Sequence, residues 1–290
     1  TGTSSAHVDA GEDTLLDRLA REAIESAGWQ GSIQEVSGDD LSGRRVQWVR
    51  GVLEHMRRAG GINHEWLAAY QKGDGQRYHI WGGRKRSEGM PAFPKGRSAP
   101  TFPRLGGQKG KGELEPATDP RSWYAVWTGR VLDVPAADGG RLTAALLRAL
   151  ERDGRLVSQH TESGGEVFAI PYQSIIVRAV DLGDLRSGRN MLECDVCAAL
   201  TPGAVETNDA LEGAPCLSTR CSGHLRRKEV DENFYRRMYQ GASMRRLVAR
   251  EHTGLLKDEE RVAYENQFKA GAKDPSAPNV LVATPTLEMG

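Results

Sequence analysis

The sequence predicts an α+β protein assembled from several modules rather than one large domain. Apolar residues make up 38% of its 290 residues, and it contains 34 glycines, which favours several small cores. A chain of this length can form two or more domains. Amphipathic helix patterns and short strand patterns both occur, and all four cysteines fall within one short stretch. We therefore predict five successive segments, at residues 1–71, 72–118, 119–182, 183–228 and 229–290.

The charge and hydropathy of the sequence indicate which partners and locations to expect. The net charge is zero, but from Lys72 to Lys111 only Asp74 and Glu88 oppose the many basic residues. No apolar run approaches the roughly 18 residues of a transmembrane helix, and the first residues do not resemble a signal peptide. We expect no membrane partner and a cytoplasmic location. Because the sequence starts without Met and ends abruptly, we also expect an excised fragment of a longer protein.

The first segment, residues 1–71, reads as helical. Residues 14–27 place apolar side chains near one face, and Gly28 would end that helix. Residues 43–61 repeat the pattern and stop at a Gly-Gly pair, while residues 64–70 suggest a short third helix. His64-Glu65 begins like a zinc-protease motif, but position 68 is alanine, so the second metal ligand is missing.

Residues 72–118 form a basic segment rich in glycine and proline, with interspersed aromatic residues. Such a composition cannot build a core of its own. One interpretation is a strap on nucleic acid, in which cations neutralise phosphates and rings stack on bases. The other is a flexible linker whose aromatic residues dock on a neighbouring domain. The candidate nucleic-acid-binding residues here are Arg84, Lys85, Arg86, Lys95 and Arg97.

Residues 119–182 resemble a winged-helix module. The stretch 123–132 fits either a strand or a short helix, and residues 140–156 predict a clear amphipathic helix that Gly154 ends. Alternating residues on either side of Ser163-Gly164-Gly165 then predict a β-hairpin. A helix followed by a hairpin is how a winged helix-turn-helix ends. That fold reads nucleic acid in some proteins and contacts protein in others.

The cysteines predict a metal centre. Cys194 and Cys197 form one pair and Cys216 and Cys221 a second, with eighteen residues between the pairs. Zinc prefers four soft ligands in a tetrahedron, and this separation suits a zinc ribbon of two knuckles in a reducing compartment. Four thiolates leave no open coordination position, so the zinc would be structural rather than catalytic. His224 follows closely enough to replace one cysteine.

Residues 229–290 predict a strand–loop–helix–strand unit of a parallel sheet. Leu247 to Ala249 form a short strand pattern, and residues 257–271 form a helix with acidic residues in its first turn. The run "VLVA", Val280 to Ala283, fits a buried strand, and a threonine-rich loop follows it. In parallel sheets the binding loops lie at the carboxyl ends of the strands.

This order is similar to the second RecA-like domain of superfamily 2 DEAD/DEAH-box helicases, especially large bacterial helicases of the mitomycin-repair type with a cysteine-bearing insertion. The motifs are His252-Thr253-Gly254, the helix from Glu259 to Phe268, and "VLVATPTLEMG". The resemblance covers roughly sixty residues, and "RYHIWGGRKRSEGMPAFPKGRSAP" extends it. It implies a partial RecA-like α/β domain. It also implies that four residues contact the backbone of the tracked strand: Thr253, Gly254, Thr284 and Thr286.

Two functional hypotheses follow. The first is an internal part of an ATP-dependent DNA helicase or translocase, in which the parent protein binds ATP and Mg²⁺ and this segment supplies DNA contacts and a structural zinc site. The segment has no Walker A loop and no Walker B strand, so alone it should be inactive. The second is a non-enzymatic nucleic-acid-binding or scaffold protein made of winged-helix and zinc-ribbon modules. In the first case the remainder of the motor is an additional partner.

Overall fold

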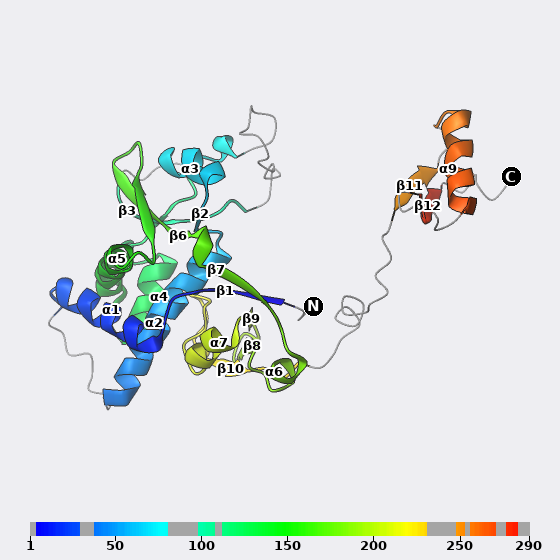
Figure 1. Cartoon of the computed structure of the whole chain (residues 1–290). Helices are drawn as coiled ribbons and strands as arrows, with labels where there is room; N and C mark the ends of the chain where they lie inside the picture. The colour runs from blue at the N-terminus through cyan, green and yellow to red at the C-terminus, as the bar shows by residue number, and fades with distance from the viewer. Residues whose placement is uncertain are drawn as a thin grey trace. The chain divides into compact units, whose positions relative to one another are not determined.

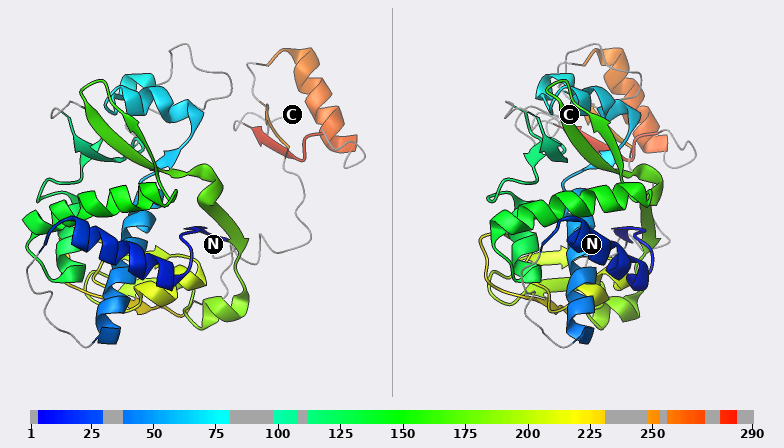
Figure 2. Two further views of the ribbon diagram at one scale, coloured as in Figure 1. Left: turned by 60° about the vertical axis from the view of Figure 1, so that its left-hand side comes forward. Right: turned by 90° about the vertical axis from the view of Figure 1, so that its left-hand side faces the viewer.

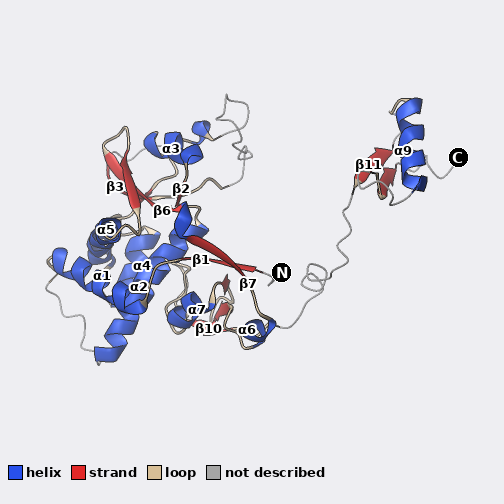
Figure 3. Ribbon diagram, in the orientation of Figure 1, coloured by secondary structure: helices blue, strands red, loops and turns tan. Residues whose placement is uncertain are grey.

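The chain forms two compact units, Thr1–Glu232 and Asn233–Gly290 (Figure 1). The computed structural model describes residues 4–29, 38–80, 98–107, 112–230, 248–252, 256–270 and 277–283. Helices and strands are both present in each unit, which confirms the predicted α+β class (Figure 3). No helix within these ranges combines the length and the apolar character needed to cross a membrane.

Four helices build the main core of the first unit. They are α1 (Asp13–Ser26), α2 (Gly38–Arg58), α4 (Trp123–Leu132) and α5 (Ala136–Arg152). The apolar stripes predicted for residues 14–27, 43–61 and 140–156 point into this core, so those helices are confirmed. Helix α5 packs beside both α1 and α4 (Figure 2).

Helix α4 resolves the ambiguity at residues 123–132. The Ser122 side chain accepts a hydrogen bond from the Ala125 backbone N–H and caps the helix, which ends at Asp133 in a left-handed conformation. Helices α2 and α4 are in close contact at Gly51, where the Trp127 ring of α4 lies against the α2 backbone. A Cβ added at Gly51 would lie only 2.2 Å from that ring, so the contact requires glycine. A buried polar contact accompanies this packing: the indole of Trp48 donates to Thr128 Oγ1 at 2.7 Å.

A five-stranded sheet covers one side of this helical core. Its strands are β2 (Ile62–Asn63), β3 (Pro103–Gly106), β4 (Glu115–Pro116), β5 (Val157–His160) and β6 (Gly165–Pro171). Strands β5 and β6 form the predicted antiparallel hairpin, and Gly164 supplies a positive φ in its turn. Strand β6 also pairs with β2 and β3, so strands from the first two predicted segments complete the sheet around the hairpin.

A second, smaller core lies under this sheet. Tyr70 of α3 (Glu65–Lys72), Ile80 beyond the short helix η1 (Arg77–His79), and Phe102 pack against Val167 and Ala169 of β6. The Tyr70 hydroxyl donates to the Pro100 carbonyl at 2.7 Å. The predicted third helix is therefore present as α3. Ile80, Pro100 and Phe102 belong to residues 72–118, so part of the segment that was predicted to have no core of its own packs into this one.

The cysteine segment joins the same main core. Its elements are β8 (Met191–Cys194), β9 (Leu200–Pro202), α7 (Val205–Leu211) and β10 (Leu225–Arg227), with sheet order β10-β8-β9. Leu192, Leu211 and Leu225 are buried in the cluster that also holds the apolar residues of α1, α2, α4 and α5. Helix α7 packs on α2.

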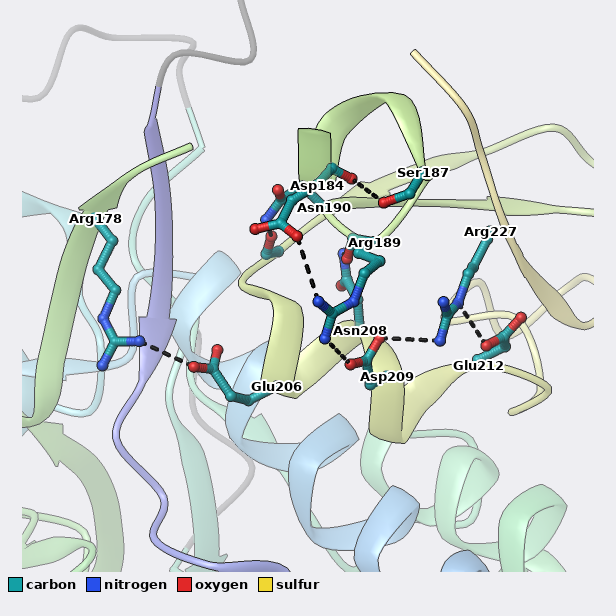
Figure 4. A network of polar contacts seen from close by, with 11 residues as sticks. Arg178, Asp184, Ser187, Arg189, Asn190, Glu206, Asn208, Asp209, Glu212 and Arg227 are labelled. Atoms are coloured by element: carbon teal, nitrogen blue, oxygen red, sulfur yellow. Dashed lines mark hydrogen bonds and ion pairs between the residues drawn. The ribbon is translucent and has the colours of Figure 1, made fainter. Parts of the chain in front are cut away.

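A chain of alternating charges ties the cysteine segment together (Figure 4). Arg189 bridges Asp184 of α6 (Leu182–Arg186) and Asp209 of α7, at 3.3 and 2.7 Å. Arg227 of β10 continues the chain from Asp209 to Glu212. Beside it, β1 (Ser4–Val8) pairs with β7 (Ile175–Ala179), which follows the short helix η2 (Tyr172–Ser174). Arg178 of β7 pairs with Glu206.

The second unit contains β11 (Ala249–His252), α9 (Asp258–Ala270) and β12 (Val280–Ala283). Strands β11 and β12 pair in parallel, with Ala249 opposite Val280 and His252 opposite Ala283. The predicted strand–helix–strand unit is therefore confirmed. The first strand, β11, extends to His252, three residues beyond the strand predicted at 247–249. Its length is set by pairing with all four residues of β12.

Candidate metal centre

The four cysteines converge at one point, although the two pairs are distant in sequence. Their Sγ atoms all lie within 4.8 Å of one another. Cys194 Sγ is 3.5 Å from Cys221 Sγ, and Cys197 Sγ is 3.6 Å from Cys216 Sγ. A disulfide would need about 2.05 Å, whereas a zinc tetrahedron with bonds of about 2.3 Å places its sulfurs about 3.8 Å apart. The spacing therefore fits four ligands of one tetrahedral ion.

Strand β8 positions the first knuckle. Cys194 is the last residue of that strand, and its thiol accepts hydrogen bonds from the backbone N–H groups of Val196 and Cys197, at 3.4 and 3.5 Å. The turn closes at Ala198, whose φ of 55° is unusual for a residue other than glycine. Backbone donors aimed at a sulfur orient it and stabilise its thiolate form.

The second knuckle repeats this arrangement without a flanking strand at its start. The Ser218 N–H donates to Cys216 Sγ, and the Gly223 N–H donates to Cys221 Sγ, each at 3.4 Å. The two knuckles meet at Gly223, where an added Cβ would lie 2.6 Å from Cys194 Sγ. Only glycine allows the loops to approach this closely.

Helix α4 clamps the second knuckle from the main core. Arg130 donates to the carbonyls of Cys216 and Ser218, at 2.8 and 3.1 Å, and the Trp123 indole donates to the Leu217 carbonyl at 2.6 Å. These bonds satisfy loop carbonyls, and they place a guanidinium beside the thiol cluster. The centre is therefore fastened to a helix more than eighty residues away in sequence.

The electrostatics of the cluster call for a cation. Burial acts to raise the pKa of Cys194, but hydrogen bonds from the Cys197 and Val196 backbone outweigh it and lower that pKa to about 7. Burial raises the pKa of Cys216 to about 12. Crowded thiols resist joint ionisation because each negative charge disfavours the next. A bound divalent cation reverses this balance and allows all four to act as thiolates.

The donor set fits zinc, and it fits a structural site. Three of the cysteines are buried and Cys197 is exposed, and together they fill the four positions of a tetrahedron. His224 does not belong to the group. Its backbone N–H donates to Asp195 Oδ1 at 2.7 Å, so its part in the centre is to link the two knuckles through the main chain. The prediction of a cysteine metal site is consistent with this geometry.

The other predicted site residues lie outside the described residues. This applies to both sets of candidate nucleic-acid contacts: Arg84, Lys85, Arg86, Lys95, Arg97, Thr253, Gly254, Thr284 and Thr286. Their roles stay predictions. The end of β11 at His252 and the end of β12 at Ala283 lie side by side, and the two threonine-containing segments follow these ends in the sequence.

One feature of the metal centre gave no sequence signal. A pocket of about 400 Å³ opens beside the second knuckle and is lined by the last turn of α2, the start of α4 and the chain around β9. Its lining residues come from four separate parts of the sequence, the second knuckle included, so no local spacing could reveal it. Comparison of the chain with protein-family models, curated proteins and solved structures found no match.

Proposed function

We propose that the chain is an internal part of an ATP-dependent DNA helicase or translocase, in which the first unit is an accessory body held by a structural zinc ion. The observation that carries this proposal is the parallel pair β11 and β12, joined through α9. Their carboxyl ends are adjacent, which is where the loops of a parallel sheet contact ligands. The resemblance of the flanking motifs to helicase motor domains adds the DNA backbone as the ligand.

The second unit has the surface of an element made to be covered. Val262 and Phe268 of α9 are 50% and 42% exposed, and Val282 of β12 is 59% exposed. A two-stranded sheet is marginally stable in isolation, and parallel strands are normally buried on both faces. A partial RecA-like domain that packs against further strands and helices of a motor explains these exposed apolar side chains.

We also propose finer module assignments for the first unit, which its elements support. Helix α5 and the β5–β6 hairpin form the helix-and-wing part of a winged-helix-like module. Strands β8, β9 and β10 with the two cysteine knuckles form the zinc ribbon. In this proposal the zinc holds the ribbon together, while ATP and Mg²⁺ bind elsewhere in the motor. The partners are DNA and the remainder of the motor in the cytoplasm.

The second candidate is a non-enzymatic nucleic-acid-binding or scaffold protein. It is favoured by the organisation of the first unit, whose main core runs from Val8 to Leu225 and includes residues from each of its three described sheets. Such a unit could act by binding alone.

ATP hydrolysis separates the two candidates. In a longer protein that carries this chain together with Walker motifs, we expect ATPase activity that single-stranded DNA stimulates. Thr253→Ala should reduce that stimulation, because the helicase resemblance assigns this hydroxyl to the DNA backbone. Thr219→Ala, in the zinc ribbon, is the control and should leave it unchanged. DNA binding without any DNA-stimulated turnover would rule out the helicase and favour the second candidate.

A further inference from the structure

The pocket beside the zinc centre has the size of a ligand site. Its volume of about 400 Å³ falls within the range of small-molecule pockets, roughly 300–1,000 Å³. The walls come from the last turn of α2, the first residue of α4, the chain entering β9, and the second cysteine knuckle. The side chains that line it include those of His55, Arg58, Trp123, Leu200, Leu217 and Ser218.

An ordered aromatic stack forms one wall. The His55 and Trp123 rings are nearly parallel, with centroids 3.7 Å apart and an interplanar angle of 3°. Trp127 continues the stack behind Trp123, at 5.5 Å and 16°. The indole of Trp123 is held by its bond to the Leu217 carbonyl. Because His55 and Trp127 cover the two faces of Trp123, the stack offers a ligand the His55 ring and the edge of Trp123, held in place at little cost in conformational entropy.

One side chain of the pocket, Arg58, can bind an anion. Arg58, the exposed last residue of α2, lines the pocket and forms no ion pair with any of the described residues. His55 is the other nitrogen base in the wall; neither Asp nor Glu is among the lining residues, but Glu115 Oε2 lies 3.8 Å from His55 Nε2, so any anion is expected at Arg58 rather than at His55. Arg130 and the proposed zinc ion together offset three of the four thiolate charges behind Cys216. An anionic group near Arg58 would therefore meet a guanidinium that is paired with no carboxylate among the described residues.

We propose that this pocket binds one nucleotide of a single-stranded DNA chain. The base packs against the aromatic wall and the half-exposed Leu200 side chain, and a phosphate contacts Arg58. The polar side chains of the wall besides Arg58 and His55 are those of Thr201, Ser218 and Cys216, so no amide is present to read the edge of a base and binding should tolerate any sequence. This inference rests on the proposed contact of the chain with DNA and gives that contact a location.

Zinc and nucleotide should be linked through the second knuckle. Cys216, Leu217 and Ser218 belong both to the pocket wall and to the metal-binding loop. If zinc leaves, this wall loses the bonds that shape it. Bound DNA should in turn slow the removal of zinc by a chelator, because a ligand that binds only the zinc-loaded form stabilises that form.

The test measures binding of fluorescein-labelled (dT)15 to the zinc-loaded chain by fluorescence anisotropy. Arg58→Glu is compared with Arg152→Glu, a matched control, since Arg152 is also the exposed last residue of its helix. We expect Arg58→Glu to weaken binding by roughly tenfold and to lower the log–log salt slope by about one. Arg152→Glu should bind like the unmodified chain. Circular dichroism and zinc content verify that both variants fold.

Two further arms identify the ligand and its place. Competition with dTMP separates a strand from a free nucleotide: weaker binding of dTMP than of (dT)15 supports the strand, and equal affinity overturns it. A photo-cross-link from an oligonucleotide with 5-iodouracil should map to peptides containing His55, Trp123 or Leu200. A cross-link confined to α5, or loss of binding only in Arg152→Glu, would overturn the pocket as the site.

The outcomes also separate this inference from the proposed function. If the unmodified chain binds (dT)15 and Arg58→Glu binds equally well, the pocket assignment is wrong while DNA binding stands. If the unmodified chain fails to bind (dT)15 even at low salt, the pocket assignment and DNA binding by this chain both fail. DNA-stimulated ATP hydrolysis in the longer protein does not depend on either result.

Discussion

The Trp123 indole donates a hydrogen bond of 2.6 Å to the carbonyl of Leu217, across 94 positions of sequence. This bond joins the first residue of α4 to the loop between Cys216 and Cys221. The same indole stacks on His55 of α2, so one side chain connects two core helices with the metal-binding loop. The metal centre and the helical core are therefore parts of one structural unit.

Removing this donor should loosen the second knuckle. Trp123→Phe retains an aromatic ring but loses the N–H, which leaves the Leu217 carbonyl without its partner. We expect the free energy of unfolding of the first unit to fall by about 1 kcal/mol, measured by urea denaturation. Trp66→Phe is the control, because that partly buried indole N–H donates no hydrogen bond to any of the described residues. Equal losses in the two variants would show that ring volume, rather than the hydrogen bond, is responsible.

Loss of a cysteine ligand should release the metal. The purified chain is expected to contain one zinc ion per molecule, measured by inductively coupled plasma mass spectrometry, and Cys216→Ser should lose most of it. The empty knuckles can no longer hold β8 and β10 in register, so the thermal midpoint should drop by roughly 10 °C.

Thr219→Ala serves as the control for that experiment, since Thr219 is exposed and lies within the same loop. It should retain both zinc and thermal midpoint. Zinc content near zero in the unmodified chain, with its fold intact, would contradict the metal assignment.

The contact between the knuckles at Gly223 makes a steric prediction. In Gly223→Ala the new methyl group would meet Cys194 Sγ at 2.6 Å, so the sulfur or the loop must move. Metal geometry tolerates such displacement poorly, and we expect zinc affinity to fall by about tenfold or more, measured by competition with a chromophoric chelator. Gly43→Ala is the matched control, because nothing lies within 4 Å of its added Cβ.

The control should differ from Gly223→Ala in its effect on both stability and zinc affinity. Gly43 lies inside α2, where alanine is favoured over glycine by up to about 1 kcal/mol, so Gly43→Ala should stabilise the chain and leave zinc affinity unchanged. If Gly223→Ala also retains full zinc affinity, the close approach of the two knuckles is not required for metal binding.

The metal centre could be predicted from the sequence because the spacing of its ligands is a local pattern. Two cysteine pairs at ligand spacing can be recognised wherever they occur, and backbone N–H groups two or three residues on supply the remaining geometry. The groups that fasten the centre could not be found this way. Trp123 and Arg130 act on it across more than eighty residues, and nothing in the pattern of residues 119–182 distinguishes them from ordinary core or surface residues.

Helices and strands that local sequence patterns specify were predictable, whereas those that depend on tertiary packing were not. Helix α5 and the hairpin after it were predictable because periodicity and turn residues specify them locally. Helix α4 was ambiguous because its short apolar run suits a strand equally well, and only its packing on α2 and α5 decides the outcome. The sheet around β6 was not predicted, because its other strands, β2, β3 and β4, are too short to show any alternation.

A buried carboxylate in that sheet region gives the last prediction. Asp74 adopts a left-handed backbone conformation, with a φ of 57°. Its Oδ1 accepts from the Ser163 hydroxyl at 2.6 Å and its Oδ2 from the Ser163 backbone N–H at 3.1 Å. It thereby ties the end of α3 to the hairpin turn. Burial acts to raise the pKa of Asp74, but these hydrogen bonds, with Thr161 and Arg104, outweigh it and lower the pKa below its ordinary value of 3.8.

The direction of this shift fixes the pH dependence. A carboxyl whose folded-state pKa is depressed stabilises the fold above its unfolded pKa, and that stabilisation is lost as pH falls through the folded pKa. Asp74→Asn keeps the side-chain shape and tolerates the left-handed backbone, but it removes the charge. At pH 7 we expect it to lower the free energy of unfolding by about 2 kcal/mol. The difference from the unmodified chain should remain constant down to about pH 4 and shrink below it, as measured by urea denaturation across that range.

Asp138→Asn, at an exposed pair with Arg141 on α5, should change stability by less than about 0.5 kcal/mol throughout. A difference for Asp74→Asn that does not vary with pH would mean that shape, and not the ionised carboxylate, holds the hairpin turn to α3.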